Sequence, residues 1–162
     1  MRWFAPLLVL SISPLAALQA KTSLGVFDDW GAFRDTRRCY AIAMPETLGR
    51  SALPGAFASV GTWPDRGVRG QLHIRLSRDT AKGARIRLRI GRQSFVLTGS
   101  GRDAWARDKG MDAAILAAMR SNARMRVSSV SKTGRPFSDT TGLEGAASAM
   151  DAATLGCAPR RR

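Results

Sequence analysis

The sequence contains little of the chemistry that catalytic and metal sites use. It has one histidine, His73, and two cysteines, Cys39 and Cys157. A Ser-His-Asp or Cys-His arrangement would have to include His73, but its neighbours on the polar face of an expected strand are Arg69 and Arg75, not a carboxylate. No two potential ligands occur at a zinc-binding spacing. We therefore expect a non-enzymatic protein with no catalytic residue, no metal and no cofactor, and we interpret His73 as an exposed strand residue.

One glycine pattern could suggest a cofactor but lacks the necessary context. Gly99, Gly101 and Ala104 spell G-x-G-x-x-A after an expected strand, as in a dinucleotide-binding turn. Gly110 interrupts the helix that should follow, and no acidic residue ends the next expected strand to hold a ribose. We interpret these glycines as part of a loop.

Acidic residues are scarce as well. The chain has 12 Asp and Glu against 26 Lys and Arg, which gives a net charge of +14, and most of the excess lies between residues 64 and 135. A field of this sign attracts polyanions. The alternative is that the basic residues only keep the protein soluble.

Long apolar runs are absent except at the N-terminus. Arg2 precedes the apolar stretch Phe4–Leu18, and small Ala20 closes the segment, which is the order of a secretory signal peptide. At about 1.5 Å per residue, a helix of this length reaches roughly 22 Å, short of the ~30 Å hydrocarbon core of a membrane. We interpret residues 1–20 as a cleavable signal and expect a periplasmic or secreted protein without a transmembrane anchor. A permanent anchor is the alternative.

Export changes the partners that the positive charge would meet. Outside the cytoplasm these are lipopolysaccharide, acidic glycans and anionic lipids, rather than a specific nucleic acid. An oxidising compartment also favours a disulfide between Cys39 and Cys157, which would join the two ends of a single domain over residues 21–162. Free thiols and intermolecular bridging are the alternatives.

Two segments alternate strictly between apolar and polar residues, which is typical of strands with one buried face. Residues 68–76 would bury Val68, Gly70, Leu72, Ile74 and Leu76. Residues 84–90 would bury Ala84, Ile86, Leu88 and Ile90. A two-residue turn at Gly91 and Arg92 would lead into a strand at 93–98. Further strands are expected at 39–44, 57–63 and 124–131.

Two other segments have a helical period. Apolar residues of 111–119 recur at i, i+3 and i+4, so residues 112–120 should form a helix. Thr141 and Glu144 resemble a capping box for a second helix that Gly156 would end. Segments 45–56 and 99–110 are expected to be loops. The sequence therefore predicts a mainly β, α+β fold: an antiparallel β-sandwich-like domain with two short helices.

Five arginines form the candidate anion-binding set. They are Arg69 and Arg75 on one expected strand and Arg85, Arg87 and Arg89 on another. If the two strands pair, the guanidinium groups share one face, where they could bind phosphate or carboxylate in bidentate fashion. The alternative is a solvated strand face whose arginine stems cover apolar surface.

The segment SLGVFDDWGAFRD, followed by RRCYAIAMP, resembles the opening of invasion associated locus B family proteins. The later order is also similar, with a strand pair, a glycine-rich loop, the helix DAAILAAMR, the strand RMRVSSV and a closing helix. Family members commonly carry further cysteines, whereas residues 40–156 contain none here. The resemblance implies an exported, β-rich envelope or secreted protein with no known catalytic activity, which would act by binding. The alternative is a polyanion-binding module that uses the arginines.

Overall fold

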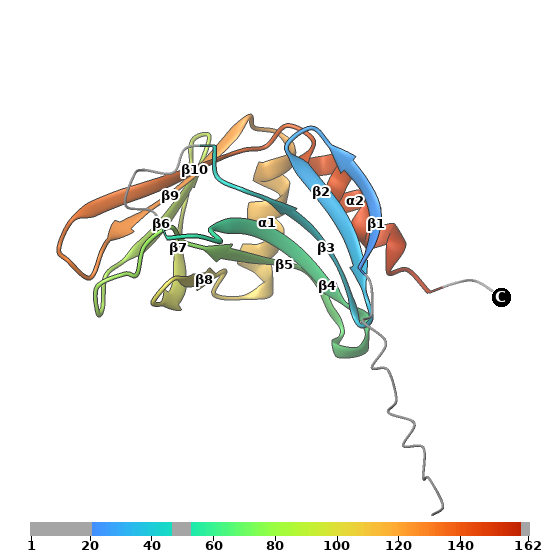
Figure 1. Ribbon diagram of the computed structural model, residues 1–162, viewed down its shortest axis with the longest axis horizontal. Helices are drawn as coiled ribbons and strands as arrows, with labels where there is room; N and C mark the ends of the chain where they lie inside the picture. Colours follow the sequence, from blue (N-terminus) through green and yellow to red (C-terminus); the bar gives the residue numbers. More distant parts are fainter. Residues whose placement is uncertain (1–20, 47–52, 160–162) are drawn as a thin grey trace, which may run out of the picture.

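The computed structural model describes residues 21–46 and 53–159. The signal peptide expected at residues 1–20 lies outside the described residues. Ten strands and two α-helices occur in the described part, which confirms the mainly β, α+β fold class (Figure 1). In chain order the elements are β1 (Thr22–Phe27), β2 (Trp30–Asp35), β3 (Arg38–Ala43), β4 (Phe57–Trp63), the 3₁₀ helix η1 (Pro64–Arg66), β5 (Val68–Arg75), β6 (Ile86–Ile90), β7 (Gln93–Ser100), β8 (Asp103–Trp105), α1 (Lys109–Arg120), β9 (Arg124–Val130), β10 (Pro136–Gly142) and α2 (Ala146–Gly156).

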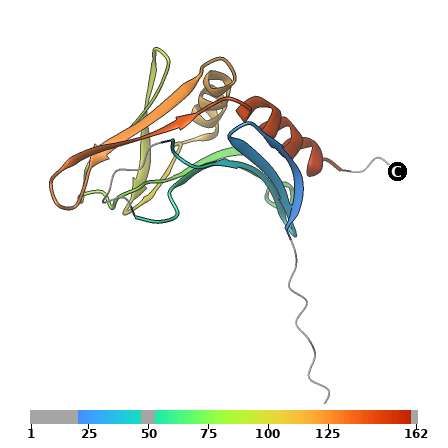
Figure 2. The same cartoon turned by 45° about the horizontal axis from the view of Figure 1, so that its top comes forward.

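All ten strands belong to one antiparallel sheet with the order β1-β2-β3-β4-β5-β8-β7-β6-β9-β10. The sheet bends, so that the half made of β1 to β5 and the half made of β6, β9 and β10 lie on two sides of the molecule (Figures 1 and 2). Side chains from both halves, including Ile74, Leu88 and Met125, meet in one hydrophobic cluster. The sandwich-like packing therefore arises from a single folded sheet.

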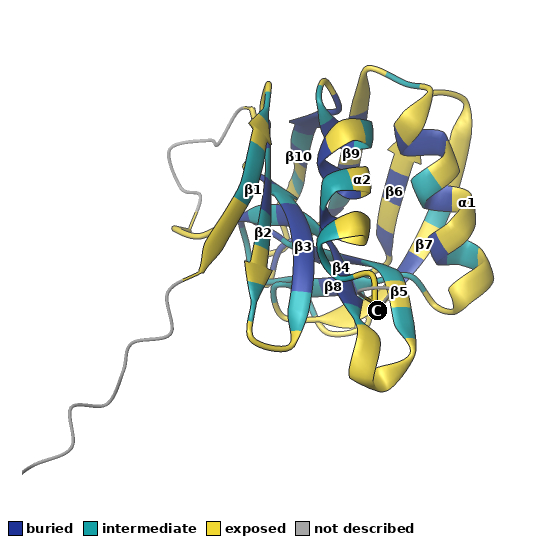
Figure 3. Cartoon of the chain, turned by 90° about the vertical axis from the view of Figure 1, so that its right-hand side faces the viewer, coloured by how far each residue is buried: buried dark blue, intermediate teal, exposed yellow. Residues whose placement is uncertain are grey.

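Both helices pack on the inner side of the bend (Figure 3). Helix α2 contacts β1, β2 and β3, whereas α1 contacts mainly β5. Ile115 and Met119 of α1 and Met150 of α2 are buried in the core. The apolar stripe expected on each helix is thus what attaches it to the sheet.

The two strictly alternating segments form strands as expected. Buried side chains include Leu72, Ile74 and Leu76 from the first segment and Ile86, Leu88 and Ile90 from the second. Burying one such side chain contributes roughly 1.5–3 kcal/mol to folding. The two-residue hairpin turn is also confirmed, because Ile90 pairs with Gln93 and Gly91 adopts a φ of +54°. Turns of this kind require a positive φ that glycine adopts freely.

The expected helix cap at Thr141 is wrong. Thr141 is buried in β10, and α2 begins only at Ala146, after Gly145 with a φ of +79° and no side-chain cap. A side chain at Gly145 would also collide with the backbone carbonyl of Phe27. The chain therefore needs a glycine at position 145. The Thr-x-x-Glu pattern that resembled a capping box spans the end of β10.

The loop expected at 99–110 is wrong too. It contains the end of β7, the short strand β8 and the first residues of α1, whose N-cap Asp108 accepts a hydrogen bond from the Met111 amide at 2.8 Å. Gly99 and Gly101 lie at the β7–β8 hairpin, and a Cβ at Gly99 would collide with the carbonyl of Asp103. Of the other expected loop, residues 45–46 and 53–56 are irregular, and the rest lies outside the described residues.

Two buried hydrogen-bonded contacts tie the halves of the sheet together. The Trp30 indole Nε1 donates to the carbonyl of Gly142 at 2.8 Å, linking β2 to β10. The backbone amide and the hydroxyl of Ser77, just after β5, donate to the two carboxylate oxygens of Asp139 on β10 at 2.8 and 2.5 Å. Because Asp139 is only 4% exposed, these donors replace the water that its charge would otherwise need.

Candidate functional site

The two arginine groups do not share one face of a strand pair. Strand β5, which carries Arg69 and Arg75, is separated from β6 by β8 and β7. The pairing on which the common face depended is therefore absent. The β7–β8 hairpin accounts for this. Its turn lies in the segment that was expected to be a loop, and its two strands lie between β5 and β6.

Arg75 already has a carboxylate partner. Its Nη1 donates to both oxygens of Asp103 at 3.0 and 3.1 Å, and His73 Nε2 lies 2.9 Å from the same carboxylate. The His73 ring stacks on Trp105 with centroids 5.0 Å apart. His73 is thus a half-buried residue with an acidic partner, and the expectation of an exposed, unpartnered histidine is wrong. Asp103 was missed because β8 was assigned to a loop.

Arg69 is exposed near the start of β5. It stands beside Gly70, whose φ of +67° accompanies a register shift in the pairing of β4 with β5. The alternation expected from residue 68 onward therefore becomes regular only from Gln71. Arg69 joins neither the Arg75 cluster nor the arginines of β6.

The β6 arginines do form a cationic surface, with a partner that sequence reasoning missed. Strand β6 pairs with β9, which places Arg89 directly opposite Arg126 and Arg87 opposite Ser128. All three arginines are exposed, as is Arg85 one residue before β6. We call Arg87, Arg89 and Arg126 the arginine face.

The arginine face borders a hollow of about 460 Å³ that is lined by Arg87, Arg89, Arg126, Ser128, Pro136, Phe137 and Ser138. Within residues 21–46 and 53–159, none of its arginines forms an ion pair with an acidic side chain. Like charges directly opposite one another destabilise a sheet. Guanidinium forks in this setting can bind phosphate or carboxylate groups in bidentate fashion.

The sequence pattern alone indicated that the Arg126 side chain points outward. The segment RMRVSSV alternates, so an outward position for Arg126 followed from the expected strand at 124–131. What the sequence did not supply was the neighbour of that strand. The pairing of β6 with β9 brings together residues that lie far apart in the chain.

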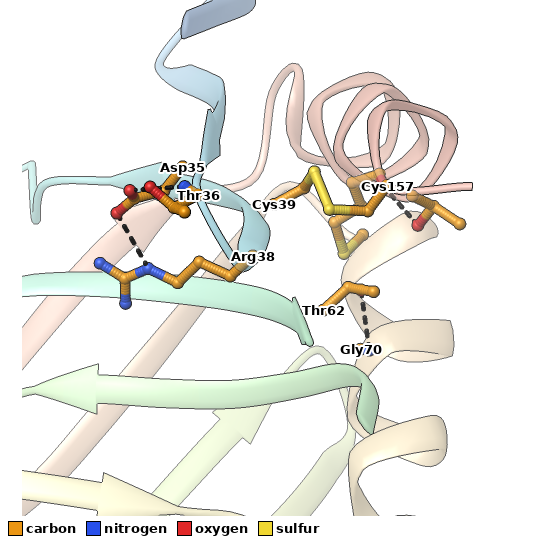
Figure 4. Close-up of a disulfide and its surroundings, with 9 residues drawn as sticks. Asp35, Thr36, Arg38, Cys39, Thr62, Gly70 and Cys157 are labelled. Carbon is orange, nitrogen blue, oxygen red and sulfur yellow. Dashed lines mark hydrogen bonds and ion pairs between the residues drawn. A yellow bond between two sulfur atoms is a disulfide. The ribbon is translucent and has the colours of Figure 1, made fainter. Parts of the chain in front are cut away.

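The disulfide between Cys39 and Cys157 is confirmed, with Cα atoms 5.7 Å apart and a sequence separation of 118 residues (Figure 4). Cys39 is a fully buried residue of β3, and Cys157 is the residue at which α2 ends. The bond therefore attaches the C-terminal end of α2 to the sheet.

The described part of the chain holds no group of three or more His, Cys, Asp or Glu side chains placed to share a metal ion. In the same residues, every helix is too short or too polar to cross a membrane.

Comparison with known proteins gives one match. A family model described as "Invasion associated locus B (IalB) protein" matches residues 34–154. This range begins within β2 and ends within α2, so it includes the arginine face and Cys39. Neither the curated proteins nor the solved structures provide a match.

Proposed function

The chain belongs to the invasion associated locus B family, and from that premise we propose that it is an exported, non-enzymatic envelope or secreted protein that acts by binding. The N-terminal residues 1–20 support export, since they have the order of a signal peptide. The disulfide supports it as well, because such bonds persist in oxidising compartments.

Export has a direct test. The protein recovered from the cell envelope or the medium should begin within a few residues of Lys21, as read by N-terminal sequencing. Recovery of the full-length chain from the cytoplasm alone would contradict this part of the proposal.

The bound partner in this proposal is an anionic surface, and the arginine face is the surface that binds it. The observation that carries the proposal is the pairing of Arg89 with Arg126 across β6 and β9, with no acidic side chain to neutralise either in the described residues. An external phosphate or carboxylate would relieve the repulsion and accept charge-assisted hydrogen bonds. Lipopolysaccharide, acidic glycans and anionic lipids all offer such groups.

The experiment compares two variants of equal net charge. One replaces Arg87, Arg89 and Arg126 by serine, and the other replaces three exposed arginines elsewhere, Arg37, Arg66 and Arg107. In sedimentation with vesicles that contain lipopolysaccharide, the apparent affinity of the first variant should fall at least tenfold, since the loss of even one hydrogen bond to a charged group costs roughly 1.5–3 kcal/mol. The second variant should stay within about threefold of the wild type, because Arg37 and Arg66 share a hollow with Asp35 and Asp65, and Arg107 pairs with Asp108, so their charges are already partly compensated.

Equal loss in the two variants would show that only net charge matters. No loss in the first variant would show that the arginine face is not the binding surface.

A further inference from the structure

The outer face of β3, β4, β5 and β8 carries an aromatic groove that is separate from the arginine face. Across these strands Tyr40 pairs with Gly61, Gly61 with Gln71, and His73 with Trp105, so their side chains point to one side of the sheet. The hollow has a volume of about 370 Å³. Its lining includes Lys21, Arg38, Tyr40, Trp63, His73 and Trp105, and we call this surface the aromatic groove.

Glycine lets the Trp63 ring lie along the sheet. A Cβ on Gly61, two residues earlier in β4, would collide with the six-membered ring of Trp63. The same arrangement occurs on β2, where a Cβ on Gly31 would lie 2.7 Å from the Phe33 ring. Trp63 is half-buried, so the ring combines support from the backbone beneath it with access to solvent. An indole held in this way can offer its flat face to a ligand.

The aromatic rings at the end of the groove formed by His73 and Trp105 are held in fixed positions. His73 stacks on Trp105 with an interplanar angle of 7°, and Phe57 meets the His73 ring edge-on at 5.2 Å. Asp103 fixes the imidazole through its 2.9 Å contact and is itself held by Arg75. These ring positions are set by the protein before any ligand arrives, which reduces the entropy lost on binding.

The other end of the aromatic groove, where Lys21 and Arg38 lie, is positively charged. Lys21 and Arg38 line it, and the Arg38 guanidinium lies 4.8 Å from the centroid of the Tyr40 ring. Asp35 lies 3.6 Å from Arg38 but outside the hollow, and no acidic side chain of the described residues lines it. The Gln71 amide and the Ser59 hydroxyl add hydrogen-bonding groups between the two ends.

We propose that the aromatic groove binds an acidic saccharide. A pyranose ring has one apolar C–H face that can lie on an indole, hydroxyl groups that an amide can recognise, and, in a uronic acid, a carboxylate that suits Lys21 and Arg38. The volume lies in the range of about 300–1,000 Å³ that small-molecule sites occupy.

Proline-rich peptides also bind aromatic grooves. A neutral peptide of this kind would make no use of the positive charge of Lys21 and Arg38, so charge complementarity favours the saccharide. The inference goes beyond the proposed function, because it concerns a different surface and a recognition that depends on ring stacking as well as on charge.

Tryptophan fluorescence gives the test. Of the tryptophans in the described residues, Trp30 is fully buried, whereas Trp63 and Trp105 line the aromatic groove. Titration of the mature protein with a short oligogalacturonate should change the emission saturably. The methyl-esterified oligomer, which lacks the negative charge, should bind about tenfold more weakly.

Two groove variants and one control complete the experiment. Trp63→Ala should weaken oligogalacturonate binding about tenfold, the order expected for a lost stacking contact. Arg38→Ser, at a half-buried position, should reduce the preference for the charged oligomer. In the serine variant of Arg87, Arg89 and Arg126 the saturable change in tryptophan emission should keep its wild-type midpoint, because Trp63 and Trp105 line the aromatic groove and no tryptophan lines the hollow at the arginine face.

The proposal is overturned by an absence of saturable binding of either oligomer, by unchanged binding in both groove variants, or by saturable binding of a proline-rich peptide alone. It is also overturned if the arginine-face variant, and not the groove variants, loses the saturable change in tryptophan emission. That last outcome would leave the proposed function intact, so the two failures are distinguishable.

Discussion

Arg89 on β6 lies directly opposite Arg126 on β9, two residues of like charge that are cross-strand neighbours. Such a pair destabilises a sheet by roughly 0.2–1 kcal/mol. Residues that bind a partner are often unfavourable for stability in its absence. This pairing is the basis of the first prediction.

Arg126→Glu should stabilise the fold and weaken polyanion binding at the same time. An opposite-charge pair with Arg89 replaces a repulsive one, so the free energy of unfolding should rise by about 0.5 kcal/mol. Urea denaturation gives the stability, and sedimentation with lipopolysaccharide vesicles gives the binding. If the variant is less stable than the wild type, the two side chains do not interact as the register indicates. If it binds as well as the wild type, the arginine face is not the site.

Loss of the disulfide should strongly destabilise the protein. The bond closes a loop of 118 residues, so replacing both cysteines by serine should lower the free energy of unfolding by about 2–5 kcal/mol. Urea denaturation with and without reductant measures the effect, and the double-serine variant is the control because reductant should not change it. An unchanged midpoint on reduction of the wild type would contradict the prediction.

Asp112 supplies the pH dependence that the structure predicts most directly. The pairing of β5 with β8 ends at His73. The backbone amide of the preceding residue, Leu72, donates to Asp112 Oδ1 of α1 at 2.8 Å and not to a neighbouring strand. Burial raises the pKa of the Asp112 carboxyl above its ordinary value, although the Leu72 amide opposes this and the charge of Asp108 adds to it.

A raised pKa in the folded state means that the folded protein holds this proton more tightly than the unfolded chain. The corresponding stability is present below the unfolded pKa of about 3.9 and is lost as the pH rises through the folded pKa. Asp112→Asn keeps an oxygen for the Leu72 amide and removes the titration. Relative to the wild type, this variant should gain stability as the pH rises from about 4 to 7.

Denaturation at a series of pH values measures the difference. Asp112→Ala is the matched control, because it leaves the Leu72 amide without its acceptor and should lower the free energy of unfolding by about 1–3 kcal/mol. A difference between Asp112→Asn and the wild type that does not change with pH would contradict the raised pKa.

The contact between Ser77 and Asp139 should hold the two halves of the sheet together. Asp139→Ala leaves the Ser77 amide and hydroxyl unpaired in the interior, so we expect a loss of about 2–4 kcal/mol in the free energy of unfolding. A double-mutant cycle with Ser77→Ala should give a coupling energy above about 0.5 kcal/mol. Arg120→Ala, which breaks the exposed pair with Asp151 between α1 and α2, is the control and should cost less than about 1 kcal/mol. Equal costs at the two sites would contradict the structure.

Local patterns in the sequence were sufficient for the central strands. The sequence alternates without interruption over residues 68–76 and 84–90, and Gly91 marks the turn that follows, so both strands were predictable, and so were their buried faces from Leu72 and from Ile86 onward. The disulfide was predictable because two cysteines leave one intramolecular pairing. β1, β2 and β10 were missed because they contain glycine, aspartate or proline and alternate less regularly.

Non-local pairing was the part that could not be predicted. The neighbours of a strand depend on the whole arrangement of the sheet, and β8 is only three residues long. Without β8, His73 had no visible partner and β5 was free to be placed beside β6. Without the pairing of β6 with β9, Arg126 could not be added to the arginine face, and without β8, Arg75 could not be removed from the set.

The most direct test of the proposed function is the salt dependence of binding to heparin, a linear polyanion, by the mature protein. Each arginine that contacts the polyanion releases condensed counterions, so the logarithm of affinity should fall linearly with the logarithm of salt concentration. The proposal predicts that the variant with serine at Arg87, Arg89 and Arg126 has a slope shallower by about 2–3 than the wild type, since each lost contact removes nearly one unit. The variant with serine at Arg37, Arg66 and Arg107 should keep the wild-type slope. Equal slopes in all three proteins would contradict a polyanion site on the arginine face.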